Sequence, residues 1–198
     1  MEKKIYIMLG RSGSGKGTQI DLFMKYLEGK GVENIVHSTT GGEFRAFIQS
    51  DSYTASIARE IVNQGGLPPE FIAIWAWTNN LIKTLKGNET LIIDGSPRRP
   101  VEMEALRGAI PYYGYGKATV IYLDVSEVWA TDKLMSRGRE DDKDLEAMKR
   151  KMKWFQDDVI PCVDLYEKDS SVSFIRVNGE QTVEQVHAEL ISKLENLI

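Results

Sequence analysis

Five short apolar runs, separated by longer segments with helical periodicity, dominate the pattern of the chain. Each run is rich in Ile and Val, which is typical of strands that are buried on both faces. The predicted strands are residues 5–9, 34–36, 90–93, 118–123 and 172–177. Because helical segments separate them, we expect the strands to lie parallel, with helices on both sides. The pattern therefore predicts an α/β protein with three α/β/α layers around a five-stranded parallel sheet.

Two helical patterns stand out near the ends of the chain. Residues 20–27 form an amphipathic segment, and apolar residues recur at helical spacing near the C-terminus. This C-terminal repeat consists of Val183, Val186, Leu190, Ile191, Leu194 and Leu197. Another long helix is expected to begin near Lys143 and to end or kink at Pro161, because proline lacks the backbone N–H that a helix needs.

One long stretch, residues 39–89, contains no strand signal. It holds helical candidates near 42–49, 54–64 and 69–86, and the segment Gly65–Pro69 interrupts them. We interpret the stretch as a helical insertion at the carboxyl edge of the sheet, where ligands bind in folds of this class.

A glycine-rich segment, Gly10–Gln19 with the sequence GRSGSGKGTQ, lies between the first predicted strand and the first helix. In this position the backbone N–H groups of the turn and the positive end of the helix can surround a polyphosphate. A lysine there can reach the terminal phosphates, whereas an ordinary tight turn has no need of Lys16. The segment therefore predicts a nucleoside triphosphate site made of Gly13, Ser14, Gly15, Lys16, Gly17 and Thr18.

Composition and charge narrow the remaining classes of function. The 198 residues suit one domain, with small inserted lids at most. A net charge of −4 argues against nucleic acid as the main partner, because binding to a phosphate backbone needs a basic surface. The single cysteine, Cys162, excludes an internal disulfide and a four-cysteine zinc site. With no signal-peptide pattern and no apolar stretch of membrane-spanning length, we expect a cytoplasmic protein that binds neither nucleic acid nor membrane.

The glycine-rich segment departs from the general pattern G-x-x-x-x-G-K-[ST], because Gly17 follows Lys16 and the hydroxyl comes one place later, at Thr18. In this form it resembles the phosphate-binding loop (P-loop) of adenylate kinases and related nucleoside monophosphate (NMP) kinases with a short lid. The resemblance implies a P-loop kinase fold and reversible phosphoryl transfer between MgATP and an NMP. It also implies a monomer that uses Mg²⁺ and no zinc, with Thr18 near the metal.

Residues Thr40–Ala46, with the sequence TGGEFRA, resemble the T-G-D-x-L-R-A segment of that family. The resemblance implies an NMP-binding insertion at residues 39–68, in which Arg45 binds the acceptor phosphate and Thr40 lies against its base. A guanidinium suits this role, since it can bind phosphate oxygens bidentately. Outside the motif, Arg45 would be interpreted as a solvated helix arginine. The family's Asp is replaced here by Gly42.

Residues Leu91–Arg98, with the sequence LIIDGSPR, resemble the family's D-G-F-P-R motif at the end of a strand. The resemblance implies that Asp94 holds Mg²⁺ through water and that Arg98 contacts the acceptor phosphate. Taken alone, this motif is equally compatible with an ordinary turn. The implied acceptor site consists of Thr40, Gly41, Arg45, Leu67, Gly95, Ser96, Arg98 and Glu102.

Glu102 occupies the position at which adenylate kinases carry a glutamine that reads the edge of adenine. A glutamine amide offers one donor and one acceptor, whereas an ionised glutamate offers acceptors only and suits guanine, uracil or thymine better. Glu102 is equally open to interpretation as a solvated helix residue or as the result of a one-residue shift in the base pocket.

AMP is the best single candidate for the acceptor on the strength of the motifs together. The alternatives within the enzyme class are GMP, UMP, CMP and a deoxynucleotide. The alternative from another class is a catalytically weak, ATP-binding regulatory module.

The resemblance continues after the fourth predicted strand. It implies that Lys133 contacts the ATP base, that Arg137 and Arg139 belong to a minimal lid at residues 137–142, and that Arg150 acts on the transferring phosphates. Lys151 is a weaker candidate for that last role, and the basic run around it is also compatible with a solvated helix face. The implied ATP-binding residues beyond the P-loop are Lys133, Arg137 and Gln181, and the implied catalytic residues are Lys16, Arg98, Arg137, Arg139 and Arg150.

The two histidines, His37 and His187, lie outside these motifs and are interpreted as structural. No general base is needed, because the acceptor is a phosphate that is largely dianionic near neutral pH. Catalysis is then expected to depend on positioning and on positive charge.

Overall fold

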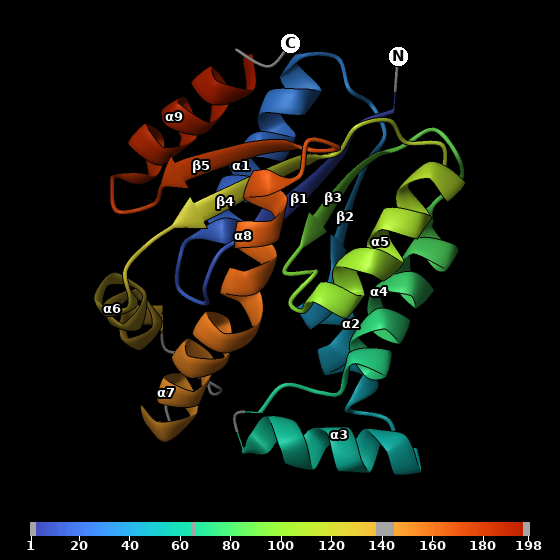
Figure 1. Cartoon of the computed structure of the whole chain (residues 1–198), viewed down its shortest axis with the longest axis vertical. Coiled ribbons are helices and arrows are strands. Elements are labelled where there is room, and N and C mark those ends of the chain that lie inside the picture. Colours follow the sequence, from blue (N-terminus) through green and yellow to red (C-terminus); the bar gives the residue numbers. More distant parts are fainter. Residues whose placement is uncertain (1–2, 65, 138–144, 196–198) are drawn as a thin grey trace.

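The computed structural model describes residues 3–64, 66–137 and 145–195. Its centre is a five-stranded parallel sheet with the strand order β2-β3-β1-β4-β5 (Figure 1). The strands are β1 (Ile5–Leu9), β2 (Ile35–Thr39), β3 (Thr90–Asp94), β4 (Thr119–Asp124) and β5 (Ser173–Asn178). This arrangement confirms the predicted parallel sheet and places the strand before the P-loop at its centre.

Strand β2 extends three residues beyond the apolar run that predicted it. His37, Ser38 and Thr39 are polar, but they pair in register with the last three residues of β3. Backbone hydrogen bonds to the neighbouring strand therefore lengthen β2 where hydropathy carries no signal. As a result, three polar side chains lie next to the carboxyl end of β3.

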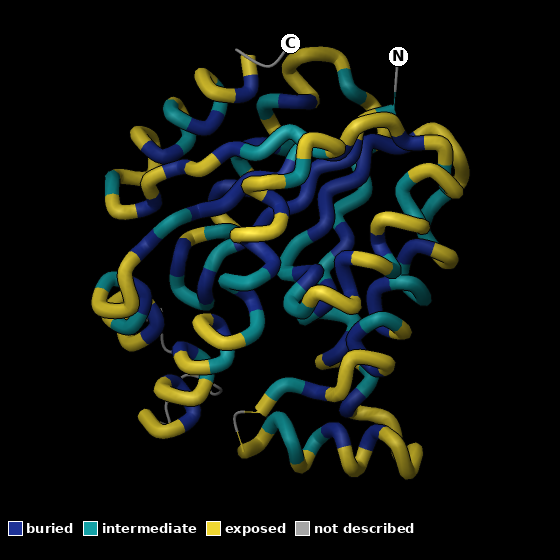
Figure 2. The backbone as a smooth tube through the Cα atoms, viewed as in Figure 1, coloured by how far each residue is buried: buried dark blue, intermediate teal, exposed yellow. Residues whose placement is uncertain are grey.

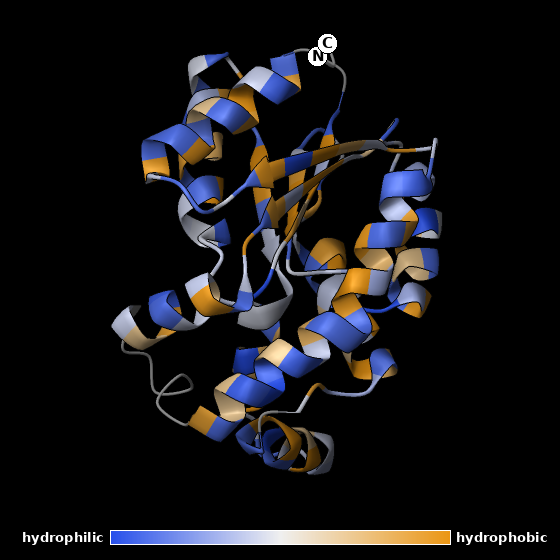
Figure 3. Ribbon diagram, turned by 60° about the vertical axis from the view of Figure 1, so that its left-hand side comes forward, coloured by the Kyte–Doolittle hydropathy of each residue, from blue (hydrophilic) through white to orange (hydrophobic). Residues whose placement is uncertain are grey.

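Helices cover both faces of the sheet, which confirms the predicted three layers (Figure 3). One layer consists of α1 (Lys16–Gly29) and α9 (Val183–Glu195), and the other consists of α4 (Glu70–Thr84), α5 (Pro100–Tyr112) and α8 (Ile160–Lys168).

Strand β1 shows how the core is built. Tyr6 and Met8 pack in the apolar cluster with α1 and α9, whereas Ile5, Ile7 and Leu9 pack in the cluster with α4, α5 and α8. This alternation follows from the two-residue period of a strand. Because both faces are apolar, a buried parallel strand has a nearly continuous apolar sequence. Figure 2 shows the strands as the buried centre, with exposed residues on the outer sides of the helices.

Helix α2 (Thr40–Phe47) begins two residues earlier than hydropathy predicted. The reason is the cap, because the Thr39 Oγ1 atom accepts a hydrogen bond from the Gly42 N–H at 3.0 Å. This cap joins the end of β2 directly to α2.

Helix α3 (Tyr53–Asn63) lies at the far end of the molecule from the sheet in Figure 1. Phe44, Ile48, Ala58 and Ile72 form a small apolar cluster of their own that joins α2, α3 and α4. The boundaries 39–68 for an NMP-binding unit remain a prediction.

Helix α6 (Glu127–Arg137) follows β4, and a further helical run leads into α8. This run consists of α7 (Leu145–Trp154) and the π-helical segment η2 (Phe155–Val159), which α8 follows directly. Pro161 therefore does not end the helix. It lies in the first turn of α8, where a missing N–H is tolerated, and the wider π turn precedes it. The predicted start near Lys143 lies outside the described residues.

Across the described segments, no helix has both the length and the apolar character needed to cross a lipid bilayer.

Candidate functional site

The P-loop (Gly10–Thr18) joins the end of β1 to the start of α1. Three of its glycines have positive φ angles that other residues rarely adopt, 150° at Gly10, 88° at Gly13 and 86° at Gly15, the N-cap residue of α1. At Gly13, a Cβ atom would lie 2.4 Å from the carbonyl oxygen of Ala130 in α6, whereas at Gly15 it would meet nothing within 4 Å. The first turn of α1 therefore begins at an open position, where unpaired N–H groups can bind an anion.

Lys16 is the first residue of α1 and folds back over the loop. Its Nζ donates hydrogen bonds to the carbonyl oxygens of Gly10 (2.5 Å) and Arg11 (3.1 Å). Its positive charge also helps to lower the pKa of Asp94 at the end of β3. The P-loop lysine and this carboxylate therefore share the carboxyl edge of the sheet.

Asp94 lies at that edge because it pairs in register with β1 on one side and β2 on the other. Its Oδ2 atom lies 3.5 Å from Nε2 of His37. Burial by itself would raise the pKa of Asp94, but His37, Lys16 and Arg98 together hold the pKa below its ordinary value. Asp94 is therefore ionised at neutral pH.

The expectation that His37 lies away from the site motifs is wrong. Strand pairing sets His37 opposite Ile92, and its ring reaches the carboxylate of Asp94. The sequence carries no signal for this contact, because it depends on which strands are neighbours. His187, by contrast, packs edge-on against Tyr26 with 6.5 Å between the ring centroids, as suits a structural residue.

Arg98 also folds toward this edge. Its Nε donates a hydrogen bond to the carbonyl oxygen of Gly95 at 2.8 Å, and its guanidinium lies 5.4 Å from the centroid of the Trp154 ring. Burial lowers the pKa of Arg98, and the negative charges of Glu102 and Asp94 oppose that shift. A partly buried guanidinium held in this way favours the approach of an anion.

Arg45 adds a second positive charge from α2. It is exposed, as expected for a solvated helix arginine, but it folds back over Gly41, where a Cβ would lie 3.2 Å from its Nη1 atom. Its charge and that of Arg99 act on Arg98 and lower the pKa of Arg98 further. The three arginines therefore concentrate positive charge beside Asp94.

A pocket adjoins Arg98 and is bordered by α2, α4 and α5. Its walls are largely apolar with a few polar groups, which suits a planar ring that needs orientation. The lining residues are Thr40, Gly41, Phe44, Leu67, Pro68, Ala73, Arg98, Arg99 and Glu102. The pocket thus brings together five residues of the predicted acceptor set, namely Thr40, Gly41, Leu67, Arg98 and Glu102.

Glu102 is 2% exposed, so its interpretation as a solvated helix residue is wrong. The Ser96 Oγ atom lies within 3.4 Å of Glu102 Oε2 and 2.7 Å from Thr40 Oγ1. Thr40 of α2, Ser96 of the loop that follows β3, and Glu102 of α5 therefore form one chain of polar contacts. This chain links the pocket to the D-G-S-P-R segment.

Arg99 is a pocket residue that the sequence analysis did not assign. Its Nη1 donates to the carbonyl oxygen of Pro68 (3.2 Å) and lies 3.3 Å from the Glu70 carboxylate. Its Nε binds Asp158 of η2 at 3.1 Å. Arg99 therefore holds the loop before α4 against η2. Its place directly after Arg98 was the one available sequence signal.

The predicted donor-side residues are spread over several elements. Lys133 lies on α6 with its Nζ 4.8 Å from the centroid of the Trp129 ring. Gln181 donates to the Asn178 carbonyl oxygen (2.9 Å) and to Glu189 (2.6 Å). These contacts orient both side chains, and their roles in ATP binding remain predictions.

The predicted catalytic arginines after α6 are less completely described. Arg150 is exposed on α7, and Lys151 beside it is half-buried. Arg137 is the last residue of α6. Arg139 and the rest of the predicted lid, residues 138–142, lie outside the described residues.

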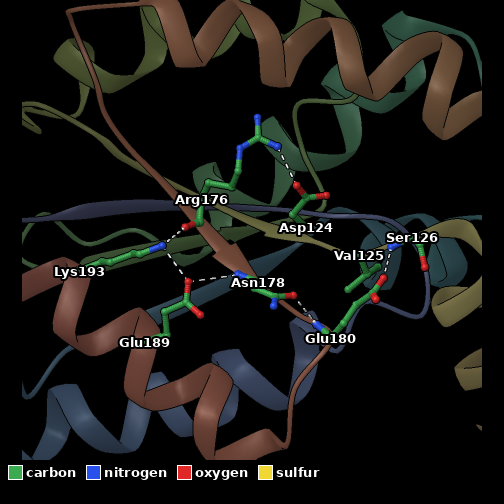
Figure 4. A pocket seen from close by; sticks show the side chains of 8 residues that line it. All are labelled: Asp124, Val125, Ser126, Arg176, Asn178, Glu180, Glu189 and Lys193. Atoms are coloured by element: carbon green, nitrogen blue, oxygen red, sulfur yellow. Dashed lines mark hydrogen bonds and ion pairs between the residues drawn. The ribbon is translucent and has the colours of Figure 1, made fainter.

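A second, polar cleft of about 440 Å³ lies at the carboxyl ends of β4 and β5 (Figure 4). Glu180 accepts a hydrogen bond from the Ser126 N–H at 2.5 Å. Gly179, the residue before Glu180, is tightly packed. A Cβ atom at this position would lie 2.5 Å from Val125 Cγ1 and 3.6 Å from the Ser14 carbonyl oxygen. Gly179, which lies between the cleft residues Asn178 and Glu180, is therefore close to the P-loop. Ion pairs between Arg176 and Asp124 and between Lys193 and Glu189 close the wall of the cleft.

Metal binding in this site depends on few protein ligands. In the described segments, no group of three or more His, Cys, Asp or Glu side chains is placed to hold a metal ion. Mg²⁺ at nucleotide sites typically keeps several waters and binds one or two protein groups plus phosphate oxygens. The ionised Asp94 and the exposed hydroxyl of Thr18 fit that donor set.

Comparison with known proteins gives a consistent result. The model of the family described as adenylate kinase matches residues 8–171. The protein named adenylate kinase from Nautilia profundicola is 29% identical over 197 residues, which cover 99% of this chain and 96% of that protein. The adenylate kinase of Campylobacter curvus is 30% identical over 198 residues, or 98% and 100% of the two chains. That of Prochlorococcus marinus (strain MIT 9515) is 30% identical over 178 residues, or 90% and 92%.

The family match includes the whole P-loop, α2 and the segment from Asp94 to Arg98, and it contains strands β2, β3 and β4 completely. Because it covers far more than half of the chain, and because relatives match over nearly their whole length, the chain belongs to the adenylate kinase family.

Proposed function

We propose that this chain is an NMP kinase that transfers a phosphoryl group reversibly between MgATP and a nucleoside monophosphate, with AMP as the acceptor. One observation carries the proposal. Lys16 of the P-loop and Arg98 beside the base pocket both act on the carboxylate of Asp94. A triphosphate held by the first group and a monophosphate held by the second would therefore meet at the same carboxylate. The relatives named adenylate kinase support the choice of reaction.

On the donor side, the N–H groups of the first turn of α1 and the Lys16 ammonium would bind the ATP phosphates. Thr18 and Asp94 would hold the magnesium ion, Asp94 through water. When bound, Mg²⁺ neutralises part of the charge that develops between the two nucleotides. Asp94 has a lowered pKa and remains ionised, so it can accept hydrogen bonds from metal-bound water at neutral pH.

On the acceptor side, Arg98 and Arg45 would bind the monophosphate. The phosphate has a second pKa of about 6 and is largely a dianion at neutral pH, so it attacks without a general base. His37 then serves to orient Asp94, from a distance of 3.5 Å, and to keep it ionised. Arg137, Arg139 and Arg150 are proposed to stabilise the charge of the transferring group.

A coupled assay tests this function. Purified protein would be incubated with MgATP and, in turn, with each of AMP, GMP, UMP and CMP, while diphosphate formation is followed. Turnover with at least one monophosphate is expected. Lys16→Gln should lower kcat by about 10²–10³-fold, the usual loss for a preorganised charge in the active site. Lys25→Gln changes an exposed lysine of the same helix and serves as the matched control.

The second candidate is an ATP-binding regulatory module with weak catalysis. It is favoured by departures from the family pattern, namely Gly42 in place of an aspartate, Ser96 in place of a phenylalanine, Lys133 in place of an arginine, and the minimal lid that the resemblance implies. ATP binding by calorimetry together with no turnover of any monophosphate would establish the module and refute the kinase.

A further inference from the structure

The carboxyl group of Glu102 lies in the wall of the base pocket, although α5 is a surface helix. Glu102 is 2% exposed, whereas its neighbour Val101 is 50% exposed. The side chains that border it in the pocket are mainly apolar, including Phe44, Leu67 and Ala73. An acidic group has thus been placed where a ligand ring would contact it and where bulk water is largely excluded.

No arginine neutralises this carboxyl group by a direct ion pair among the residues described. Arg98 turns its Nε to the Gly95 carbonyl oxygen, and Arg99 forms its ion pairs with Glu70 and Asp158. The side-chain hydrogen bond that reaches Glu102 comes from Ser96 at 3.4 Å. Because no direct ion pair fixes the charge of Glu102, its protonation state depends on its surroundings and on the ligand that binds beside it.

Burial raises the pKa of Glu102 above its ordinary value. The positive charges of Arg98 and Arg99, and hydrogen bonds from the Arg98 backbone and Ser96, oppose this shift without cancelling it. Titratable or charged groups that interact with Glu102 or with its two arginine neighbours also come from the surrounding elements: Arg45 on α2, Glu70 on α4, Asp158 on η2, and Cys162 and Tyr166 on α8.

Neither group on α8 titrates near neutral pH. Burial raises the pKa of Cys162 to about 12, and it raises the pKa of Tyr166 as well. Both Glu70 and Asp158 are paired with Arg99. Glu102 is therefore the acidic residue of the pocket lining, and burial raises its pKa above the ordinary value.

The two protonation states of a carboxyl group suit different bases. A neutral carboxyl group has one O–H donor and one C=O acceptor, the same set as a glutamine amide. It matches adenine, which offers the N1 acceptor and the N6 amino donor. An ionised carboxylate has acceptors only and matches guanine, which offers two donors, N1–H and the N2 amino group.

We propose that Glu102 selects the acceptor base by its protonation state, so that the neutral form takes AMP and the ionised form takes GMP. The proposal rests on the proposed NMP kinase function and defines its acceptor. Because each base needs a different state, the ratio of kcat/KM for AMP to that for GMP changes by up to about tenfold per pH unit around the titration of Glu102. The ionisation of the phosphate itself is common to both nucleotides and cancels in this ratio.

The first test measures that ratio from about pH 5 to pH 9, beginning close to the ordinary range of a glutamate carboxyl group. In the wild-type protein, the ratio of AMP to GMP should fall as the pH rises. In Glu102→Gln it should favour AMP and stay constant with pH. Glu104→Gln makes the same chemical change on an exposed residue of the same helix and should follow the wild type. A ratio that is independent of pH in the wild-type protein would overturn the proposal without recourse to any variant.

The second test does not need turnover. Calorimetric titration with AMP, in two buffers that differ in ionisation enthalpy, reports the number of protons taken up on binding. AMP should take up close to one proton at a pH where free Glu102 is ionised, and the uptake should vanish in Glu102→Gln. Proton uptake without phosphorylation of any monophosphate would support the selector and refute the kinase function. Phosphorylation with pH-independent selection, and with no proton uptake, would refute the selector alone.

Discussion

Gly13 and Gly15 have almost the same φ angle, 88° and 86°, but very different surroundings. A side chain at either position carries the cost of the left-handed backbone, about 1–2 kcal/mol. At Gly13, an added Cβ would also press against the Ala130 carbonyl oxygen at 2.4 Å, and overpacking of this kind costs about 1–3 kcal/mol more. The additional loss of stability in Gly13→Ala relative to Gly15→Ala is therefore about 1–3 kcal/mol.

Equilibrium unfolding in urea, followed by circular dichroism, measures this difference. For a slope of about 2 kcal/mol per M, the midpoint of Gly13→Ala should lie about 0.5–1.5 M below that of Gly15→Ala. The two variants control for each other, because the backbone cost is shared and only the contact differs. Equal midpoints would show that α6 does not pack against the P-loop as described.

Three further predictions concern the site. Asp94 has a lowered pKa, so its contribution to stability is present above the ordinary Asp pKa and is lost as the pH falls through the lowered value. His37→Ala should move this loss to higher pH in urea-unfolding profiles, and profiles that superimpose on the wild type would contradict the contact. Arg99→Ala should raise KM for the acceptor by about tenfold with KM for ATP unchanged, because it frees the loop at Pro68; Arg107→Ala, at an exposed surface ion pair, is the control. The resemblance to NMP kinases implies a minimal lid at residues 137–142, so we expect the wild-type protein to hydrolyse ATP without any monophosphate, because a short lid excludes water poorly; a phosphate-release assay that detects no hydrolysis would refute this expectation.

The strands were predictable because hydropathy is a local signal. The apolar runs at β1, β3 and β4 mark strands that are buried on both faces, and the helical segments between them favour parallel pairing. The edge strand β5 has buried Ile175 and Val177 on one face, whereas Arg176 and Asn178 on the other are exposed. The P-loop was predictable for a similar reason, since strand, glycines, lysine and helix follow one another within the sequence. The end of β2 was not predictable, because its polar residues are strand only through their pairing with β3.

The chemistry of the site depended on contacts that no local pattern contains. Glu102 lines the pocket next to Arg98, and its role toward an acceptor base stays a prediction from the resemblance. Its burial, which raises the pKa of its carboxyl group, follows from the packing of α5 against α4 and α8. The contact of His37 with Asp94 and the three contacts of Arg99 arise in the same way, from elements that meet only in the folded chain.

The junction of β2 and α2 also determines where the insertion can move. Strand β2 ends at Thr39 and α2 begins at Thr40, so no loop residue separates them. Thr39 is paired with the sheet through its backbone and caps the helix through its side chain. Helix α2 is therefore a rigid extension of the sheet, and Thr40 keeps its distance from Asp94 whatever the rest of the insertion does. Any movement of the insertion relative to the sheet therefore has to arise in residues that follow α2 along the chain.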